Sequence, residues 1–104
     1  MQLFSMYIHY YLTLKVEKFV VFGEYCDDAI TKRTPFREQH LKRLKKLKDR
    51  DILVTLGPTK CTKYFFGIFN ANDENQLKDF VEKDIYWEKS IWINYDIFPW
   101  VQAF

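Results

Sequence analysis

His40 is the residue of this sequence with the clearest potential for proton transfer. The chain has only two histidines, His9 and His40, and an imidazole can accept or donate a proton near neutral pH. On a helical wheel of about 100° per residue that starts at Phe36, His40 lies at about 40°, within the apolar arc of Leu44 and Leu47. A polar ring in that arc needs a hydrogen-bond partner. Two interpretations stay open: a general acid–base held by a carboxylate, and a structural histidine bonded to a backbone carbonyl.

The helix that carries His40 is predicted to run from Thr34 to about Asp49. Thr34 is suited to the N-cap, and Pro35 is suited to the first helical position, where no N–H is needed. Arg37 lies three residues before His40, and its guanidinium could clamp an anionic group of a substrate. The alternative is a side chain that snorkels from the helix edge into solvent. Arg37 is therefore a candidate substrate-binding residue.

The basic residues of this helix gather on the side away from the apolar arc. That side, between about 180° and 340° on the same wheel, holds Lys42, Arg43, Lys45 and Lys46. We expect it to be the solvated face of an amphipathic helix, with a polyanion-binding surface as the alternative. The net charge of only +2 does not by itself imply a polyanionic partner.

Apolar segments before and after this helix predict four strands and a second helix. The strands are expected at residues 19–22, 52–56, 64–69 and 91–98. Asn72 and Asp73 are suited to cap the second helix, which should end near Asp84, with this carboxylate turned either inward or into solvent. In the last strand, alternation places one set of side chains on one face, Ile91, Ile93, Tyr95 and Ile97, and the other set on the opposite face, Trp92, Asn94, Asp96 and Phe98.

The element order β-α-β-β-α-β predicts an α+β fold, the ferredoxin-like plait. Right-handed crossovers place both helices on one face of a four-stranded antiparallel sheet. The opposite face is then apolar and uncovered, because 19% of all residues are aromatic and both faces of the strands carry them. We expect a homodimer that forms through this face.

The scarce residue types exclude several kinds of site. Gly23, Gly57 and Gly67 stand apart from one another, so neither a glycine-rich dinucleotide-binding turn nor a phosphate-binding loop can form. Cys26 and Cys61 are not spaced as a zinc-binding pair, and we expect no metal or other cofactor. Two lone cysteines fit reduced thiols in the cytoplasm, with one disulfide as the alternative.

Five segments together resemble the YciI-like, or YCII-related, family of small dimeric ferredoxin-like proteins. They are FVVFGEY, TKRTPFREQHLKRLKKL, LVTLGPTK, FVEKDIYW and FPWVQAF. The resemblance covers residues 16–104, which we expect to form one YciI-like domain of the dimeric α/β-barrel type. Residues 1–15 are too short for a membrane span and lack a signal-peptide cleavage site. Because members of the family begin just before the first strand, we expect residues 1–15 to be an extension from a start codon assigned too far upstream.

The resemblance also implies a function and a site. A histidine on the first helix and a later aspartate form the family's suspected acid–base pair, which carries over to His40 and Asp84. The family commonly has D-P-Y where this chain has D-I-Y, and the matching segments suggest further substrate contacts at Gly57, Pro58 and Tyr86. One relative acts in the dehydrochlorination of a chlorinated hydroxyquinol, and the fold is similar to that of muconolactone isomerases. The implied function is cofactor-independent acid–base chemistry, as in a lyase, isomerase or dehydrochlorinase, on a cyclic or hydroxylated substrate.

Three classes of function remain in view. The first is this small-molecule enzyme, and the second is a homodimeric module that binds a ligand at His40 without catalysis. The third is RNA recognition, since residues 63–69 are similar to the aromatic strand of RNA-recognition modules. That strand lacks the K-G-F-G-F order, and the basic helix lies on the wrong side of the sheet. We therefore expect a small-molecule substrate and neither a nucleic-acid nor a membrane partner.

Overall fold

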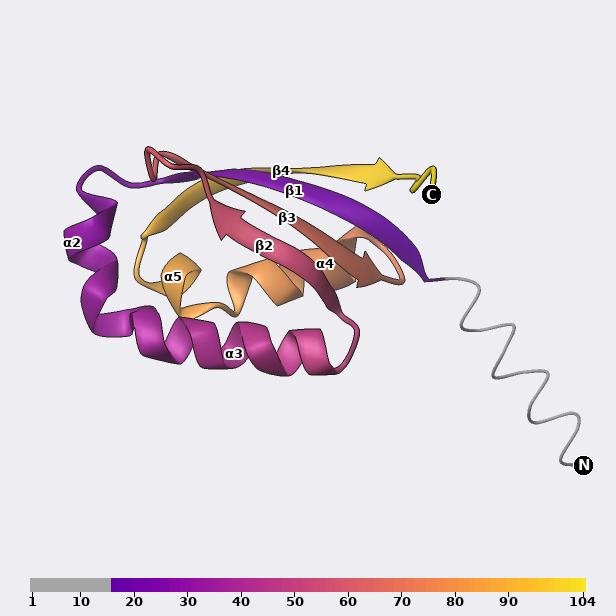
Figure 1. Cartoon of the computed structure of the whole chain (residues 1–104), viewed down its shortest axis with the longest axis horizontal. Helices are drawn as coiled ribbons and strands as arrows, with labels where there is room; N and C mark the ends of the chain where they lie inside the picture. The colour runs from indigo at the N-terminus through magenta and orange to yellow at the C-terminus, as the bar shows by residue number, and fades with distance from the viewer. Residues whose placement is uncertain (1–15) are drawn as a thin grey trace, which may run out of the picture.

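Four antiparallel strands form the sheet of this protein. The computed structural model describes residues 16–104 (Figure 1), so the predicted extension at residues 1–15 lies outside the described residues. The strands are β1 (Glu17–Tyr25), β2 (Leu53–Pro58), β3 (Tyr64–Ala71) and β4 (Trp92–Trp100). Their order across the sheet is β2-β3-β1-β4, and every neighbouring pair is antiparallel. This order and the helix connections confirm the α+β, ferredoxin-like fold.

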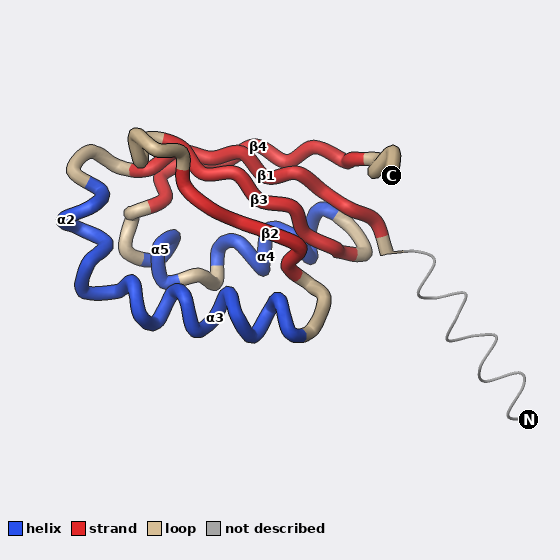
Figure 2. Tube along the Cα trace, viewed as in Figure 1, coloured by secondary structure: helices blue, strands red, loops and turns tan. Residues whose placement is uncertain are grey.

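The helices lie together on one face of this sheet (Figures 1 and 2). They are α2 (Ala29–Arg33), the 3₁₀ turn η1 (Thr34–Phe36), α3 (Arg37–Asp49), α4 (Glu74–Glu82) and α5 (Ile85–Glu88). No helix formed by residues 16–104 is long and apolar enough to cross a membrane. The face of the sheet opposite the helices carries no other element of the described chain.

The first helical segment begins earlier than predicted. α2 starts at Ala29, and η1 separates it from α3. The Thr34 hydroxyl donates a hydrogen bond to the Ile30 carbonyl at 2.7 Å, so the prediction that Thr34 caps the helix was wrong. Pro35 lies in the first turn of η1, where its missing N–H interrupts the run of α-helical hydrogen bonds. The end of α3 at Asp49 agrees with the sequence.

A β-bulge changes which way the first residues of β4 face. The pairing of β4 with β1 shifts, so that Glu24 lies opposite Asn94 while Tyr25 lies opposite Trp92. The extra residue, Ile93, is 47% exposed, whereas Trp92 is only 2% exposed. The prediction that Trp92 shares a face with Phe98, and Ile93 with Tyr95 and Ile97, was wrong, because one inserted residue reverses the facing of everything before it. Trp92 therefore turns to the helix side of the sheet.

Two prolines lie within strands at the edges of the sheet. β2 continues through Gly57 and Pro58, beyond the predicted end at residue 56, and β4 continues through Pro99 to Trp100. β2 and β4 are the outer strands. At an outer strand, a proline can be placed so that its missing N–H breaks no hydrogen bond between strands.

The hydrophobic core lies between the sheet and the helices. Its largest fully buried side chains include Trp92, Tyr86, Phe65, Phe69 and Leu77. Gly23 in β1 makes room for one of them, since a Cβ atom at this position would lie 2.2 Å from Cζ of Phe65. The Phe65 ring packs into that space and stacks on Trp92, with 4.2 Å between ring centroids. The absent side chain of Gly23 thus helps to hold Trp92 in place.

The uncovered face of the sheet is apolar at its centre. Phe22, Phe66 and Phe98 come from three neighbouring strands and are all exposed. Phe22 lies directly opposite Phe66 in the pairing of β1 with β3. This is the surface through which the sequence predicts a homodimer.

Candidate active site

His40 and Asp84 form a buried pair between α3 and the segment that joins α4 to α5. His40 Nδ1 lies 2.7 Å from Asp84 Oδ1, and the two residues are 4% and 0% exposed. A carboxylate accepts hydrogen bonds and does not donate them, so Nδ1 carries the proton of this bond. The structure thus brings together the two residues expected to form an acid–base pair, although they lie 44 positions apart in the sequence.

Local backbone structure fixes the Asp84 carboxylate. Asp84 is the N-cap of α5, a short helix that the sequence did not predict, and its Oδ1 accepts a hydrogen bond from the Tyr86 N–H at 2.9 Å. An aspartate at an N-cap satisfies one of the free N–H groups of the first turn. The same oxygen therefore accepts from the backbone and from His40, which points the carboxylate into the protein.

Arg43 completes the surroundings of Asp84. Its Nη1 donates to Asp84 Oδ2 at 3.1 Å, and its Nη2 donates to the Phe80 carbonyl at 2.8 Å. The prediction that Arg43 belongs to the solvated face was wrong, since its side chain is only 26% exposed. At about 340° on the wheel it lies only about 20° from Phe36, next to the apolar arc.

Two aromatic rings fix the plane of the His40 ring. Tyr86 stacks on it, with 3.6 Å between centroids and an angle of 9° between planes. Trp92 meets it edge-on, at 5.3 Å and 88°. One nitrogen is bonded to Asp84, one face of the ring is stacked on Tyr86 and one edge lies against Trp92, and these contacts together hold the imidazole in one orientation.

The second nitrogen of His40, Nε2, is the group left for chemistry. Among residues 16–104 it has no hydrogen-bond partner, since the hydrogen bond of the His40 ring is made by Nδ1. Within the same part of the chain, Trp92 Nε1 is the one buried side-chain nitrogen or oxygen that is fully enclosed and unpaired. His40 Nε2 is therefore not fully enclosed. In the tautomer that Asp84 sets, its lone pair is free to accept a proton.

Two arginines act on the tyrosine hydroxyls near the His40 ring. Burial raises the pKa of the Tyr86 hydroxyl, and the positive charges of Arg33 and Arg37 oppose that rise. Burial also raises the pKa of the Tyr25 hydroxyl, whereas the Trp92 N–H and Arg33 lower it. Arg37, the predicted anion clamp, is exposed. Together with Arg33 it supplies the positive charge that acts on the Tyr86 hydroxyl.

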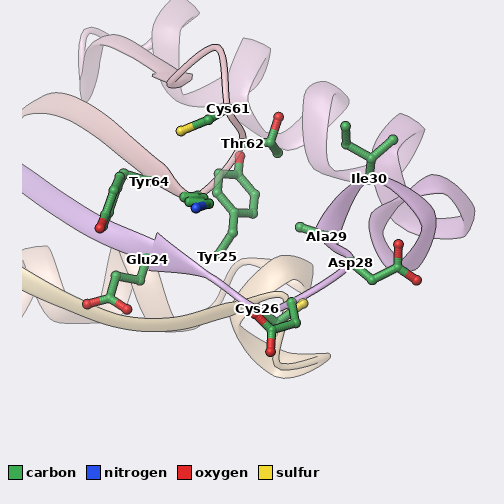
Figure 3. Close-up of a pocket in the computed structure, with 11 residues that line it drawn as sticks. Glu24, Tyr25, Cys26, Asp28, Ala29, Ile30, Cys61, Thr62 and Tyr64 are labelled. Carbon is green, nitrogen blue, oxygen red and sulfur yellow. The ribbon is translucent and has the colours of Figure 1, made fainter.

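A cavity of about 420 Å³ borders this cluster at the end of β1. Its walls come from the end of β1, the start of α2 and the loop between β2 and β3 (Figure 3). The Tyr25 side chain projects between these walls toward Thr62. The cavity provides a place for a ligand next to Tyr25, whereas His40, Asp84, Tyr86 and Trp92 do not line it.

Gly57 and Pro58, the other expected substrate contacts, lie on the outer strand β2. Gly57 pairs with Phe66, whose side chain lies on the uncovered face, and no atom lies within 4 Å of where its Cβ would be. No described contact joins either residue to His40. Their role in substrate binding stays a prediction.

The arrangement as a whole can move a proton at one fixed position. Asp84 and Arg43 hold Nδ1, Tyr86 and Trp92 hold the ring, and Nε2 is the reactive atom. No group of three potential metal-binding side chains occurs among residues 16–104. The chemistry that these side chains can supply by themselves is general acid–base catalysis.

The chain therefore combines a small α+β plait with a buried histidine–aspartate pair on the helix side of the sheet. The chain belongs to the YCII-related domain family, whose sequence pattern matches residues 18–101. No curated protein sequence matches the chain.

Solved structures with the same fold are distant in sequence. The 5-chloro-2-hydroxyhydroquinone dehydrochlorinase TftG from Burkholderia phenoliruptrix AC1100 is similar with a TM-score of 0.72 and 20% identity, over 83% of this chain and 95% of that one. PA3566 from Pseudomonas aeruginosa has a TM-score of 0.52 and 7% identity, over 85% and 94% of the two chains. At these identities the likeness shows the shared fold alone.

Proposed function

We propose that this protein is a small-molecule enzyme that uses His40 as a general acid–base on a cyclic or hydroxylated substrate. The observation that carries the proposal is the state of the two ring nitrogens. Nδ1 is bonded to Asp84 at 2.7 Å, while Nε2 has no partner among the described residues and is not fully enclosed. A histidine that only supports the core has no need of a nitrogen without a partner.

Asp84 and Arg43 are positioning residues in this proposal. Asp84 holds the tautomer in which Nε2 is a base, and it stabilises the imidazolium that forms when Nε2 accepts a proton. Arg43 Nη1 pairs with the second carboxylate oxygen at 3.1 Å, so the buried negative charge is matched. Neither residue needs to touch the substrate.

Hydroxylated aromatic rings are the first substrates to test. TftG, which shares the fold, is a dehydrochlorinase of 5-chloro-2-hydroxyhydroquinone, and its structure holds 2,5-dihydroxybenzoquinone. Loss of HCl from such a ring transfers one proton to a base and releases one chloride ion, so it needs no added oxidant or reductant. A single histidine supported by a carboxylate is suited to that proton transfer.

The test compares His40→Gln with the native protein on a panel of chlorinated and unchlorinated hydroxyquinols and lactones. Chloride release and exchange of substrate C–H for solvent deuterium are both measured. We expect His40→Gln to lose about 10²–10⁴-fold in rate, while Glu38→Gln, an exposed carboxylate on the same helix, keeps the native rate. Equal rates for His40→Gln and the native protein would contradict the proposal.

A ligand-binding module without catalysis is the second candidate. It is favoured by the cavity beside Tyr25, which could hold a ligand without any reaction. Saturable binding of panel compounds with no chloride release and no deuterium exchange in the native protein would support this candidate over the enzyme.

We also propose that the protein is a cytoplasmic homodimer. Phe22, Phe66 and Phe98 on the uncovered face are exposed, and a second copy would cover the same apolar surface on both chains at once. Cys26 and Cys61 are both free thiols, which fits a reducing compartment.

A further inference from the structure

Trp92 has a buried polar group without a partner. Its indole N–H is the one fully enclosed side-chain nitrogen or oxygen of residues 16–104 that makes no hydrogen bond. A buried donor without a partner destabilises the fold, so it needs an explanation. The group lies close enough to the Tyr25 hydroxyl to lower its pKa, although the two do not meet hydrogen-bond geometry.

Tyr25 is held in the same aromatic cluster as His40. Its ring meets Phe65 edge-on at 5.8 Å and Tyr86 at 6.4 Å between centroids, and Tyr86 stacks on His40. Tyr25 as a whole is 6% exposed. The rings therefore leave Tyr25 little freedom except at its hydroxyl.

The hydroxyl of Tyr25 is in contact with open space. It makes no hydrogen bond of ordinary geometry within residues 16–104, although Trp92 and Arg33 lie close enough to lower its pKa as hydrogen-bond donors, and it is not among the fully enclosed unpaired atoms of that part of the chain. The residue lines the cavity of about 420 Å³ at the end of β1 (Figure 3). The Tyr86 hydroxyl and His40 Nε2 likewise have no hydrogen-bond partner of ordinary geometry among the described residues and are not fully enclosed. Three polar atoms that could contact a ligand therefore belong to one cluster of packed rings.

Arg33 brings positive charge to one side of this cluster, whereas the walls of the cavity carry Glu24, Asp27, Asp28 and Lys63. Arg33 lies near both tyrosine hydroxyls, since its charge lowers the pKa of each against the rise caused by burial. The negative charge of Asp84 is matched by Arg43. An oxygen that carries or develops negative charge is thus favoured next to the hydroxyls.

We propose that the Tyr25 hydroxyl is a substrate-binding group that donates a hydrogen bond to an anionic oxygen, such as that of a phenolate or enolate, beside His40. Arg33 supplies positive charge to the same oxygen. Trp92 is a positioning residue: its N–H donates to the Tyr25 oxygen after a small movement of the Tyr25 ring when the ligand binds. Charge-assisted hydrogen bonds of this kind are about twice as strong as neutral ones. This inference rests on the proposed function for one point, the position of the substrate beside His40.

The experiment measures binding of 4-nitrocatechol, whose phenolate absorbs visible light, to the native protein and to Tyr25→Phe. We expect the dissociation constant of the phenolate to rise at least about tenfold in Tyr25→Phe, because a hydrogen bond to a charged group contributes about 1.5–3 kcal/mol. Tyr95→Phe is the matched control, since the Tyr95 hydroxyl instead donates to Glu82 at the end of α4, and the binding of the probe to this variant should equal that to the native protein.

Two further variants keep the test decisive. If Tyr25→Phe fails to fold, Arg33→Gln should weaken binding of the 4-nitrocatechol phenolate. The loss of affinity should vanish at a pH where the probe is neutral. Trp92→Phe keeps an aromatic ring next to Phe65 but removes the N–H, and the ultraviolet titration of Tyr25 should then move to higher pH.

Unchanged phenolate binding in both Tyr25→Phe and Arg33→Gln would overturn the proposal, as would the lack of any saturable binding to the native protein. The proposed function fails separately, by unchanged turnover in His40→Gln. Nitrocatechol binding that depends on Tyr25 without turnover that depends on His40 would support this inference and reject the enzyme.

Discussion

Replacement of Asp84 by asparagine tests the network around His40. Asp84→Asn keeps the size of the side chain but removes its charge and turns one acceptor oxygen into an NH₂ donor. In the native protein, the carboxylate accepts from His40 Nδ1 at 2.7 Å, from Arg43 Nη1 at 3.1 Å and from the Tyr86 N–H at 2.9 Å. The new NH₂ group must face either the imidazole N–H or the guanidinium, and donors then oppose each other.

The expected cost follows from this geometry. Asp84 is 0% exposed, and removing one partner of a buried charge pair costs about 3–5 kcal/mol. With a urea m-value of about 2 kcal/mol per molar, typical for a small domain, the urea midpoint should fall by roughly 2 M. Turnover should fall by about 10²–10⁴-fold as well, because Nε2 is no longer held as the base.

Equilibrium urea unfolding followed by circular dichroism is the assay, with Asp79→Asn as the matched control. Asp79 is an exposed aspartate on α4, so its replacement should change the free energy of unfolding by no more than about 0.5 kcal/mol. A result for Asp84→Asn as small as that of the control would refute the paired arrangement described here.

Three further predictions concern the sheet and its edges. Gly23→Ala should destabilise the fold by about 2–3 kcal/mol in urea unfolding, because the new Cβ would lie 2.2 Å from the packed ring of Phe65. Gly57→Ala is the control and should be close to neutral, since its Cβ would meet no atom within 4 Å. Equal effects of the two substitutions would contradict the close packing of Phe65 on Gly23. The Thr59 hydroxyl lies 3.2 Å from Cys61 Sγ and lowers the pKa of that thiol. Thr59→Val should therefore raise the pKa, reduce the thiolate fraction near neutral pH and slow the reaction of Cys61 with a disulfide reagent; an unchanged profile of rate against pH would exclude this cause. In light scattering, the native protein should have the mass of a dimer and Phe66→Asp that of a monomer, whereas a monomeric native protein would reject the proposed interface.

Much of the fold could be predicted because its information is local. The apolar runs of β1 and β3 mark buried strands, and Asp73 caps α4 as expected, accepting from the Gln76 N–H at 2.8 Å. Element order and the handedness of crossovers then leave few ways to arrange the sheet. The start of α2 was missed because a Thr-Pro pair fits a break inside a helical run as well as a helix start.

The candidate site was predictable only in part. The helical wheel placed His40 in the apolar arc, and the family resemblance supplied Asp84. Arg43 was assigned to the solvated face because its charge was given more weight than its angle. Its position at about 340°, beside Phe36, was the signal that pointed inward.

Tyr25 and Trp92 could not be found by the same reasoning. Alternation predicts which way a strand residue faces only where pairing is regular, and the bulge between Glu24 and Tyr25 breaks that rule. The unpaired N–H of Trp92 depends on packing between β1, β3 and β4, which no local pattern encodes. The positions of Arg33 and Arg37 near the two tyrosine hydroxyls follow from the helical segment that begins at Ala29, which the sequence did not predict.

The central claim, that Asp84 holds His40 with a free Nε2, is tested most directly by ¹⁵N NMR of the histidine rings. His40→Gln assigns the signals of His40. At a pH where the ring is neutral, we expect a protonated Nδ1 and an unprotonated Nε2 in the native protein, and a change of this pattern in Asp84→Asn. A neutral ring protonated at Nε2 in the native protein, or a pattern unaffected by Asp84→Asn, would contradict it.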